Sequence, residues 1–314
     1  MTVHDRIRLT GRPRGPRESG ALFVFRPARN GHPCGRTLPV TIDPHIAACS
    51  IERVQGGSVD ARDDEVAVEE PLEIRVDGKA LAVTMRSPGE DEELAVGFLA
   101  GEGLIAGPED LSEVGPDEEL SANVVEVRTT GGLRRDPGER RFHLTSSCGI
   151  CGKGALEDVR LTAPAPRQDG GQVAETLVLS APDELRAGQE AFGRTGGLHA
   201  TGIFDSDGRL LCLREDVGRH NAMDKAVGAL LMEGRHPLSD AFACLSGRAG
   251  FELVQKAAMA DMAGVVAVGA PSSLAVDLAR ERGMLLCGFV REDSFNVYAG
   301  SGRLAPRSAR PSTA

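Results

Sequence analysis

The sequence contains no tryptophan and a single tyrosine, Tyr298, among its 314 residues. Proteins that bind single-stranded nucleic acids stack the bases on aromatic rings, so this scarcity argues against that class. The formal net charge of -10 argues the same way, because a general binder of phosphate backbones needs a basic surface. A chain of this length can form one large domain or two modest ones.

Long apolar runs are also missing near the start of the chain. Residues 21–25 form the only apolar run there, which is too short for the core of a secretory signal and far too short to span a bilayer. We therefore expect a cytoplasmic protein that does not cross a membrane. The seven cysteines are odd in number, and a disulfide framework is not expected in a reducing compartment.

The distribution of charged and turn-forming residues predicts four segments. Residues 1–40 hold eight arginines against only Asp5 and Glu18, and no sustained periodicity is found up to residue 62. We predict a disordered tail over residues 1–62, with a short strand near residues 21–25. A smaller α+β region then covers residues 63–162 and ends in a CxxC loop, an α/β core covers residues 163–300, and residues 301–314 form a second tail.

Turn signals and apolar spacing predict the elements of the first two thirds. β-Hairpins are expected at residues 69–83 around Asp77-Gly78 and at residues 202–214 around Ser206-Asp207-Gly208. Helices are expected at residues 90–104, at residues 182–194 and after Asp216, the last with one apolar face. A strand is expected at residues 124–129, followed by a polar loop over residues 130–141.

The last third alternates short apolar runs with amphipathic stretches. Strands are predicted at residues 241–245, 265–268 and 284–290, with helices at residues 250–262 and 273–281. Such alternation implies right-handed βαβ units and a sheet covered by helices. Ligands of open α/β sheets lie beyond the carboxyl ends of the strands, which here are the loops 246–250, 269–273 and 291–294.

The pair Cys148 and Cys151 is the one CxxC motif in the sequence, and zinc binding, thiol chemistry and structural coincidence compete to explain it. Structural zinc needs four ligands and catalytic zinc three, yet no second CxxC exists. Zinc deaminases pair PCxxC with HxE, whereas Ser147 precedes Cys148 and none of the seven histidines is followed two residues later by glutamate. The catalytic zinc interpretation is therefore disfavoured.

Thiol chemistry needs a thiolate that is accessible and can move. Lys153 provides positive charge near the pair, and three glycines in residues 146–154 favour a mobile loop. A second cysteine three residues away can attack sulfur carried on its neighbour. A thioredoxin-like site is a weaker variant, because its CxxC opens a helix directly after a strand. Of the other cysteines, Cys212, Cys244 and Cys287 are predicted to be buried, and Cys34 and Cys49 are not assigned a role.

Two polar segments, residues 214–221 and residues 246–248, are predicted to open helices. Helix N-termini with glycine and serine bind phosphate, and arginine clamps it, but charges at helix starts more often form caps or internal salt bridges. Two such segments in one α/β domain, together with Arg291 after the last strand, favour a phosphorylated ligand. His199 is either a hydrogen-bonded structural residue or part of that site.

Several segments together resemble the formate dehydrogenase accessory sulfurtransferase family, the FdhD type. The resemblance runs in order from about Glu69 to Tyr298 and lies outside both tails. Its motifs are SSCGICGKG at 146–154, GGLHATGIF at 196–204, REDVGRHNAMDKAVG at 214–228, LSGRAGFELVQKAAMA at 245–260 and APSSLAVDLA at 270–279.

The resemblance implies a sulfur carrier required for formate dehydrogenase activity. Such a cytoplasmic protein receives sulfur from a cysteine desulfurase and passes it to the molybdenum bis-molybdopterin guanine dinucleotide cofactor, which it binds as a substrate and which a guanine nucleotide mimics. The family's persulfide-bearing cysteine falls on Cys148, with Cys151 as its partner. The alternative is a non-catalytic chaperone that binds the same cofactor and whose cysteines sense redox state.

The family's cofactor-binding segment falls on residues 289–294 of this chain. It consists of Phe289, Val290, Arg291, Glu292, Asp293 and Ser294, to which we add Ser246, Gly247 and Arg248 as phosphate-binding groups. Only the aromatic residue, the aliphatic residue and the arginine follow the family pattern, and the two carboxylates are unfavourable beside pyrophosphate. The resemblance also implies a homodimer and a cytidine-deaminase-like three-layer α/β core that lacks the zinc site, with a small appended N-terminal α+β region.

Overall fold

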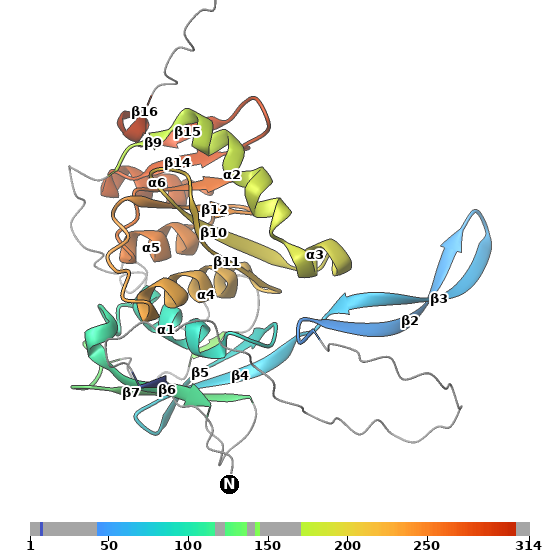
Figure 1. The fold of residues 1–314 in the computed structure, drawn as a ribbon, viewed down its shortest axis with the longest axis horizontal. Coiled ribbons are helices and arrows are strands. Elements are labelled where there is room, and N and C mark those ends of the chain that lie inside the picture. The colour runs from blue at the N-terminus through green and yellow to red at the C-terminus, as the bar shows by residue number, and fades with distance from the viewer. Residues whose placement is uncertain (1–6, 9–42, 117–122, 137–141, 145–170, 306–314) are drawn as a thin grey trace, which may run out of the picture.

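The computed structural model describes residues 7–8, 43–116, 123–136, 142–144 and 171–305 (Figure 1). Within them the chain has a mixed α/β fold, as the sequence predicts, built on two mixed sheets with helices between and beside them. The pair Cys148 and Cys151, the strand expected near residues 21–25, and residues 306–314 of the predicted second tail lie outside the described residues. The prediction of a tail is wrong for residues 301–305, which form the short helix η2 (Ser301–Arg303) and the strand β16 (Leu304–Ala305) that pairs with β9 (Val173–Ala174).

The C-terminal sheet contains the predicted βαβ alternation. Its strand order is β11-β10-β12-β13-β14-β15, and β12, β13 and β14 run parallel. The strands are β10 (His199–Asp205), β11 (Leu210–Asp216), β12 (Ala241–Leu245), β13 (Gly264–Ala267), β14 (Leu285–Gly288) and β15 (Asn296–Ala299). The last predicted strand ends earlier than residue 290 because Phe289 has a φ of 52°, which takes the chain out of the sheet.

Helices cover both faces of this sheet. On one face pack α4 (Arg219–Met232), α5 (Phe251–Met259) and α6 (Ser273–Arg282), and on the other packs α2 (Glu175–Ala187). Alternate strand residues serve the two faces: Ala243 and Val265 face the first set of helices, whereas Phe242 and Val266 face α2. The period-2 alternation of a strand produces this division, and both faces are apolar because both are covered.

The helix predicted over residues 182–194 is wrong in outline. The structure has two helices, α2 and α3 (Glu190–Thr195), which are separated at Gly188 and Gln189. Helix α2 begins before Pro182, which lies inside it, although we placed this proline at the helix start. The predicted end is confirmed, because Gly196 caps α3 in the left-handed conformation with a φ of 66°.

The N-terminal sheet lies on the far side of α4. It includes β4 (Glu70–Val76), β5 (Lys79–Arg86), β6 (Leu111–Pro116), β7 (Val124–Thr129) and the short strands β8 (Phe142–Leu144) and β1 (Ile7–Arg8). Helix α1 (Asp91–Gly101) lies between this sheet and α4 (Figure 1). The helix after Asp216 was expected to have one apolar face, but residues 221–231 of α4 are all buried because α1 covers its second side.

A β-hairpin shows that the prediction of a disordered tail over residues 1–62 is wrong for residues 46–62. Strands β2 (Ile46–Gln55) and β3 (Ser58–Ala67) pair along their whole length and extend away from the rest of the molecule (Figure 1). Most of their side chains are exposed on both faces, so the sequence has no alternation of apolar and polar residues to reveal them. The base of the hairpin is tied to α3 by ion pairs of Arg194 with Glu65 and Asp43.

Candidate functional site

The three loops predicted to hold a ligand lie together at the carboxyl ends of β12, β13 and β14. Backbone hydrogen bonds join them: the amide of Gly269 donates to the carbonyl of Gly247 at 2.9 Å, and the amide of Phe289 donates to the carbonyl of Gly269 at 3.1 Å. The amide of Ser272 donates to the carbonyl of Ala249 at 3.0 Å. These bonds give the loops one fixed arrangement at this edge of the sheet.

A cavity of about 620 Å³ lies between these loops and the α2–α3 segment. Of the predicted cofactor-binding residues, Ser246, Val290, Arg291 and Glu292 line it, and His199 joins them. Gly247 packs beside the cavity, since a Cβ added there would lie 3.4 Å from Nδ1 of His199. Arg248, Asp293 and Ser294 are exposed outside the cavity lining, and the Phe289 side chain is 44% exposed.

Arg291 brings a positive charge to this cavity. Its Nη1 donates to the carbonyl oxygens of Val268 at 2.9 Å and Val290 at 2.7 Å, which holds the guanidinium against the ends of the strands. Within the described part of the chain, no carboxylate forms an ion pair with Arg291. The remaining guanidinium donors are suited to an anionic oxygen.

His199 is neutral near pH 7. Burial lowers the pKa of its imidazole, and the positive charges of Arg219 and Arg248 lower it further, against the opposing effect of Asp216. No described residue forms a hydrogen bond with the ring, so the structural interpretation of His199 lacks the partner that it requires. A neutral imidazole can donate to a ligand or accept from it.

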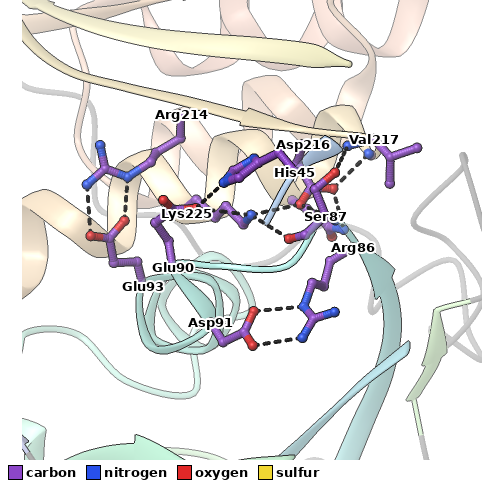
Figure 2. A network of polar contacts seen from close by, with 12 residues as sticks. His45, Arg86, Ser87, Glu90, Asp91, Glu93, Arg214, Asp216, Val217 and Lys225 are labelled. Atoms are coloured by element: carbon purple, nitrogen blue, oxygen red, sulfur yellow. Dashed lines mark hydrogen bonds and ion pairs between the residues drawn. The ribbon is translucent and has the colours of Figure 1, made fainter. Parts of the chain in front are cut away.

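Much of the polar segment 214–221 is internal. Of the two interpretations of this segment, internal salt bridges and caps are therefore favoured over phosphate binding. Arg214 forms a two-point ion pair with Glu93 of α1, and this hydrogen bonding raises the pKa of Arg214 (Figure 2). Asp216 contacts the fully buried ammonium of Lys225 at 3.0 Å and accepts from the backbone of Ser87 at 3.0 Å. These groups join the two layers of the fold and are not available to phosphate.

Three further side chains join elements near the cavity, two from this segment and one, Ser246, from the end of β12. The Glu215 carboxylate accepts from the backbone amides of Ala191 and Phe192, each at 2.9 Å, and so caps the N-terminus of α3. His220 contacts Glu252 at 2.8 Å, which joins the first turns of α4 and α5. The Ser246 hydroxyl accepts from the amide of Ala200 at 2.9 Å, and this bond fixes the end of β12 against β10.

The prediction that Cys212, Cys244 and Cys287 are buried is confirmed. Burial raises the pKa of the Cys212 thiol to about 11 and that of Cys287 to about 12, and it raises the pKa of Cys244 as well. These three thiols are therefore protonated at neutral pH and poorly nucleophilic. Cys49 lies half-buried in β2.

The described ranges contain neither a metal-binding cluster nor a membrane-spanning helix. No group of three or more histidine, cysteine, aspartate or glutamate side chains is arranged to hold a metal ion among residues 43–116, 123–136 and 171–305. In the same residues, no helix is long and apolar enough to cross a membrane.

The α2–α3 side of the cavity was not predicted as part of any site. Arg186, Gln189 and Phe192 lie there, and the sequence offers no motif around them. Their only signal is a break in helical spacing at Gly188, which we did not use. The cavity cannot be predicted from the sequence, because its two sides come from distant segments that only the fold brings together.

The fold and the cavity define an α/β protein with a pocket of mixed polar and apolar lining at the carboxyl ends of parallel strands. Comparison with known proteins specifies this class further. Residues 67–305 match the model of the FdhD/NarQ family, and the chain belongs to that family.

Similar curated proteins carry the name "Sulfur carrier protein FdhD". The protein from Streptomyces coelicolor is 51% identical over 267 residues, which cover 82% of this chain and 95% of that protein. The protein from Mycolicibacterium paratuberculosis is 47% identical over 263 residues, which cover 81% and 97%. A crystal structure from Desulfotalea psychrophila, provisionally described as a formate dehydrogenase accessory protein, superposes with a TM-score of 0.69. At 24% identity, over 83% of this chain and all of that one, it shows the fold alone.

Proposed function

We propose that this chain is a sulfurtransferase that carries sulfur as a persulfide on its CxxC pair. It delivers the sulfur to molybdenum bis-molybdopterin guanine dinucleotide, which is then taken up by formate dehydrogenase. The observation that carries the proposal is about 50% identity, over most of the chain, to proteins named as sulfur carriers. The matched family region, residues 67–305, includes both Cys148 and the cavity.

The first chemical step is thiol exchange with a cysteine desulfurase. The Cys148 thiolate attacks the outer sulfur of the desulfurase persulfide, the sulfur–sulfur bond there breaks, and the desulfurase cysteine leaves as a thiolate. Cys148 then holds the transferred sulfur as a persulfide. In the described residues the three buried thiols are protonated, so they do not compete for this sulfur.

The second step releases the sulfur to the cofactor. The Cys151 thiolate attacks the inner sulfur of the persulfide, which forms a disulfide with Cys148 and expels hydrosulfide as the new ligand of molybdenum. Oxidation of the two cysteines to this disulfide supplies the two electrons that reduce the outer sulfur to hydrosulfide, and a cellular dithiol reductant then restores both cysteines. The pair follows the end of β8 by four residues, a length that spans at most about 14 Å.

The cavity is the proposed binding site for the guanine dinucleotide end of the cofactor. Arg291, with no carboxylate partner among the described residues, and neutral His199 supply donors for phosphate, while Ser246 fixes the adjoining strand end. Glu292 also lines the cavity, and its carboxylate is unfavourable beside phosphate, so this residue argues against the assignment. We also propose that the core is cytidine-deaminase-like, and that the protein works in the cytoplasm as a homodimer.

Complementation tests the carrier function. In cells that lack their own FdhD, Cys148→Ala is expected to abolish formate dehydrogenase activity and Cys151→Ala to reduce it strongly, because each removes a sulfur needed in one step. Cys49→Ala, which removes a half-buried thiol in β2, is the matched control and is expected to restore full activity. Full activity of the Cys148→Ala/Cys151→Ala double variant would instead indicate a chaperone that binds the cofactor without carrying sulfur.

A further inference from the structure

Three residues on the α2–α3 side of the cavity are arranged to hold a planar ring. Arg186, Gln189 and Phe192 are spaced three apart along the chain, and all three line the cavity. The Arg186 guanidinium lies 4.3 Å from the centre of the Phe192 ring. Stacked guanidinium and aromatic planes form a surface on which another flat ring can stack. The Glu215 cap on α3 fixes the position of Phe192 within this surface.

Gln189 places an unsatisfied donor at the same wall. Its side chain is only 6% exposed, and its Nε2 has no hydrogen-bond partner among the described residues. Buried polar groups in folded proteins are nearly always paired. A buried donor that lines a cavity and lacks an acceptor therefore indicates that the occupant of the cavity supplies the acceptor.

The two sides of the cavity carry different hydrogen-bonding and stacking groups. The strand-end side carries Arg291 and His199, along with the carboxylate of Glu292. The α2–α3 side carries the ring platform, the Gln189 amide and apolar residues such as Leu185. A nucleotide placed in this cavity therefore points its phosphates toward the strand ends and its base toward α2 and α3.

We infer that Gln189 determines which base the cavity accepts, by donating a hydrogen bond from Nε2 to a ring carbonyl oxygen. This inference rests on the proposed function, in which the occupant carries guanine. Guanine presents the O6 acceptor on its pairing edge, whereas adenine presents an amino donor at the same position. Facing the Gln189 Nε2 donor, an adenine amino group would place two donors opposite each other with no acceptor between them.

Calorimetric titration of the full chain with GDP and with ADP tests this assignment. The wild-type chain is expected to bind GDP in preference to ADP. Gln189→Leu is expected to weaken GDP binding about tenfold with little effect on ADP, because one neutral hydrogen bond is lost. Gln189→Glu replaces the donor with an acceptor and is expected to reverse the preference toward ADP.

The matched control is Gln255→Leu, the same change at a buried glutamine of α5 outside the cavity lining, with GDP affinity expected to stay at the wild-type value. Thermal unfolding of each variant reports whether it is folded, and Gln189→Glu, nearly equal in shape, carries the test if Gln189→Leu does not fold. Equal GDP affinity of wild type and folded Gln189 variants would overturn the inference and leave the proposed function standing. A wild-type chain that binds neither nucleotide would contradict the proposed function itself.

Discussion

At the scale of single residues, burial sets the chemical state of the groups around the cavity. The thiols of Cys244 and Cys287 lie in strands that are covered on both sides, so their protonated form is favoured. The His199 imidazole lies at the start of β10, where burial and nearby positive charges lower its pKa and keep it neutral. The same physical effect thus removes the core cysteines from sulfur chemistry and leaves an uncharged donor in the pocket.

His199 predicts a pH dependence of nucleotide binding. Its pKa in the free protein lies below the usual value, so the ring gains its proton only as the pH falls below about 6.5. A bound phosphate favours the charged ring, and by linkage GDP affinity is expected to rise as His199 becomes protonated, by roughly tenfold. Asp216 favours this protonation, whereas Arg219, His220 and Arg248 oppose it.

Titration of GDP binding between pH ~5 and pH ~8 measures this effect. The His199→Gln variant keeps a neutral hydrogen-bonding group and should lack the rise at low pH. The difference between the two profiles gives the contribution of the imidazole to the pH dependence of GDP affinity, because protonation of the GDP phosphate itself affects both proteins equally. Parallel profiles for wild type and His199→Gln would exclude contact between the ring and the phosphates.

At the scale of elements, the crossing of α1 and α4 depends on two glycines. A Cβ added to Gly97 of α1 would lie 1.8 Å from the carbonyl oxygen of Asp224, and one added to Gly228 of α4 would lie 1.9 Å from that of Glu93. Each contact involves backbone, which cannot move aside as a flexible side chain can. Only hydrogen at both positions allows the two helices to come this close.

Gly97→Ala is therefore expected to destabilise the protein by about 3 kcal/mol or more, although alanine is the better helix former. Gly193→Ala in α3 is the control, because an added Cβ there meets no atom within 4 Å. It should leave stability unchanged or raise it by up to ~1 kcal/mol. Urea unfolding monitored by circular dichroism measures both, and equal stabilities of the two variants would show that the helices can separate without penalty.

Elements with local signals were the ones that the sequence could predict. The turn at Asp77-Gly78 has positive φ at both residues, 48° and 78°, which is the conformation that an Asp-Gly pair favours between strands. The strand predicted at residues 124–129 coincides with β7. The β2–β3 hairpin escaped prediction because exposed strands need no alternation, and the α2–α3 break escaped because Pro182 resembled a helix start.

The loops of the candidate site could be placed from the sequence for a similar reason. Parallel strands put their carboxyl ends at one edge, so predicting the strands also predicted where residues 246–250 and 291–294 meet. The α2–α3 side of the cavity could not be predicted, since no sequence feature near Gln189 indicates that α2 and α3 pack close to these loops. Of the polar segment 214–221, spacing alone could not tell that Arg214 and Asp216 face inward.

At the scale of the whole molecule, polar contacts join the N-terminal region to the C-terminal core: Arg214 pairs with Glu93 of α1, and Asp216 accepts from the amide of Ser87 (Figure 2). Arg86, only 2% exposed, pairs with Asp91 and Glu70, while Lys225 reaches Asp216 and Glu90. Strand β5, which Arg86 ends, pairs with β8, the last described strand before the CxxC pair. The network therefore holds the cavity and β8, the strand that precedes the CxxC pair in the chain, in a fixed relative position.

Labelling with radioactive sulfur tests whether Cys148 accepts sulfur from a cysteine desulfurase. The full chain is incubated with a cysteine desulfurase and labelled cysteine, separated without reductant, and digested to locate the label. We expect the label on the peptide that contains Cys148, its removal by a thiol reductant, and its absence from Cys148→Ala but not from Cys49→Ala. A wild-type chain that stays unlabelled while the desulfurase itself carries persulfide would contradict the account.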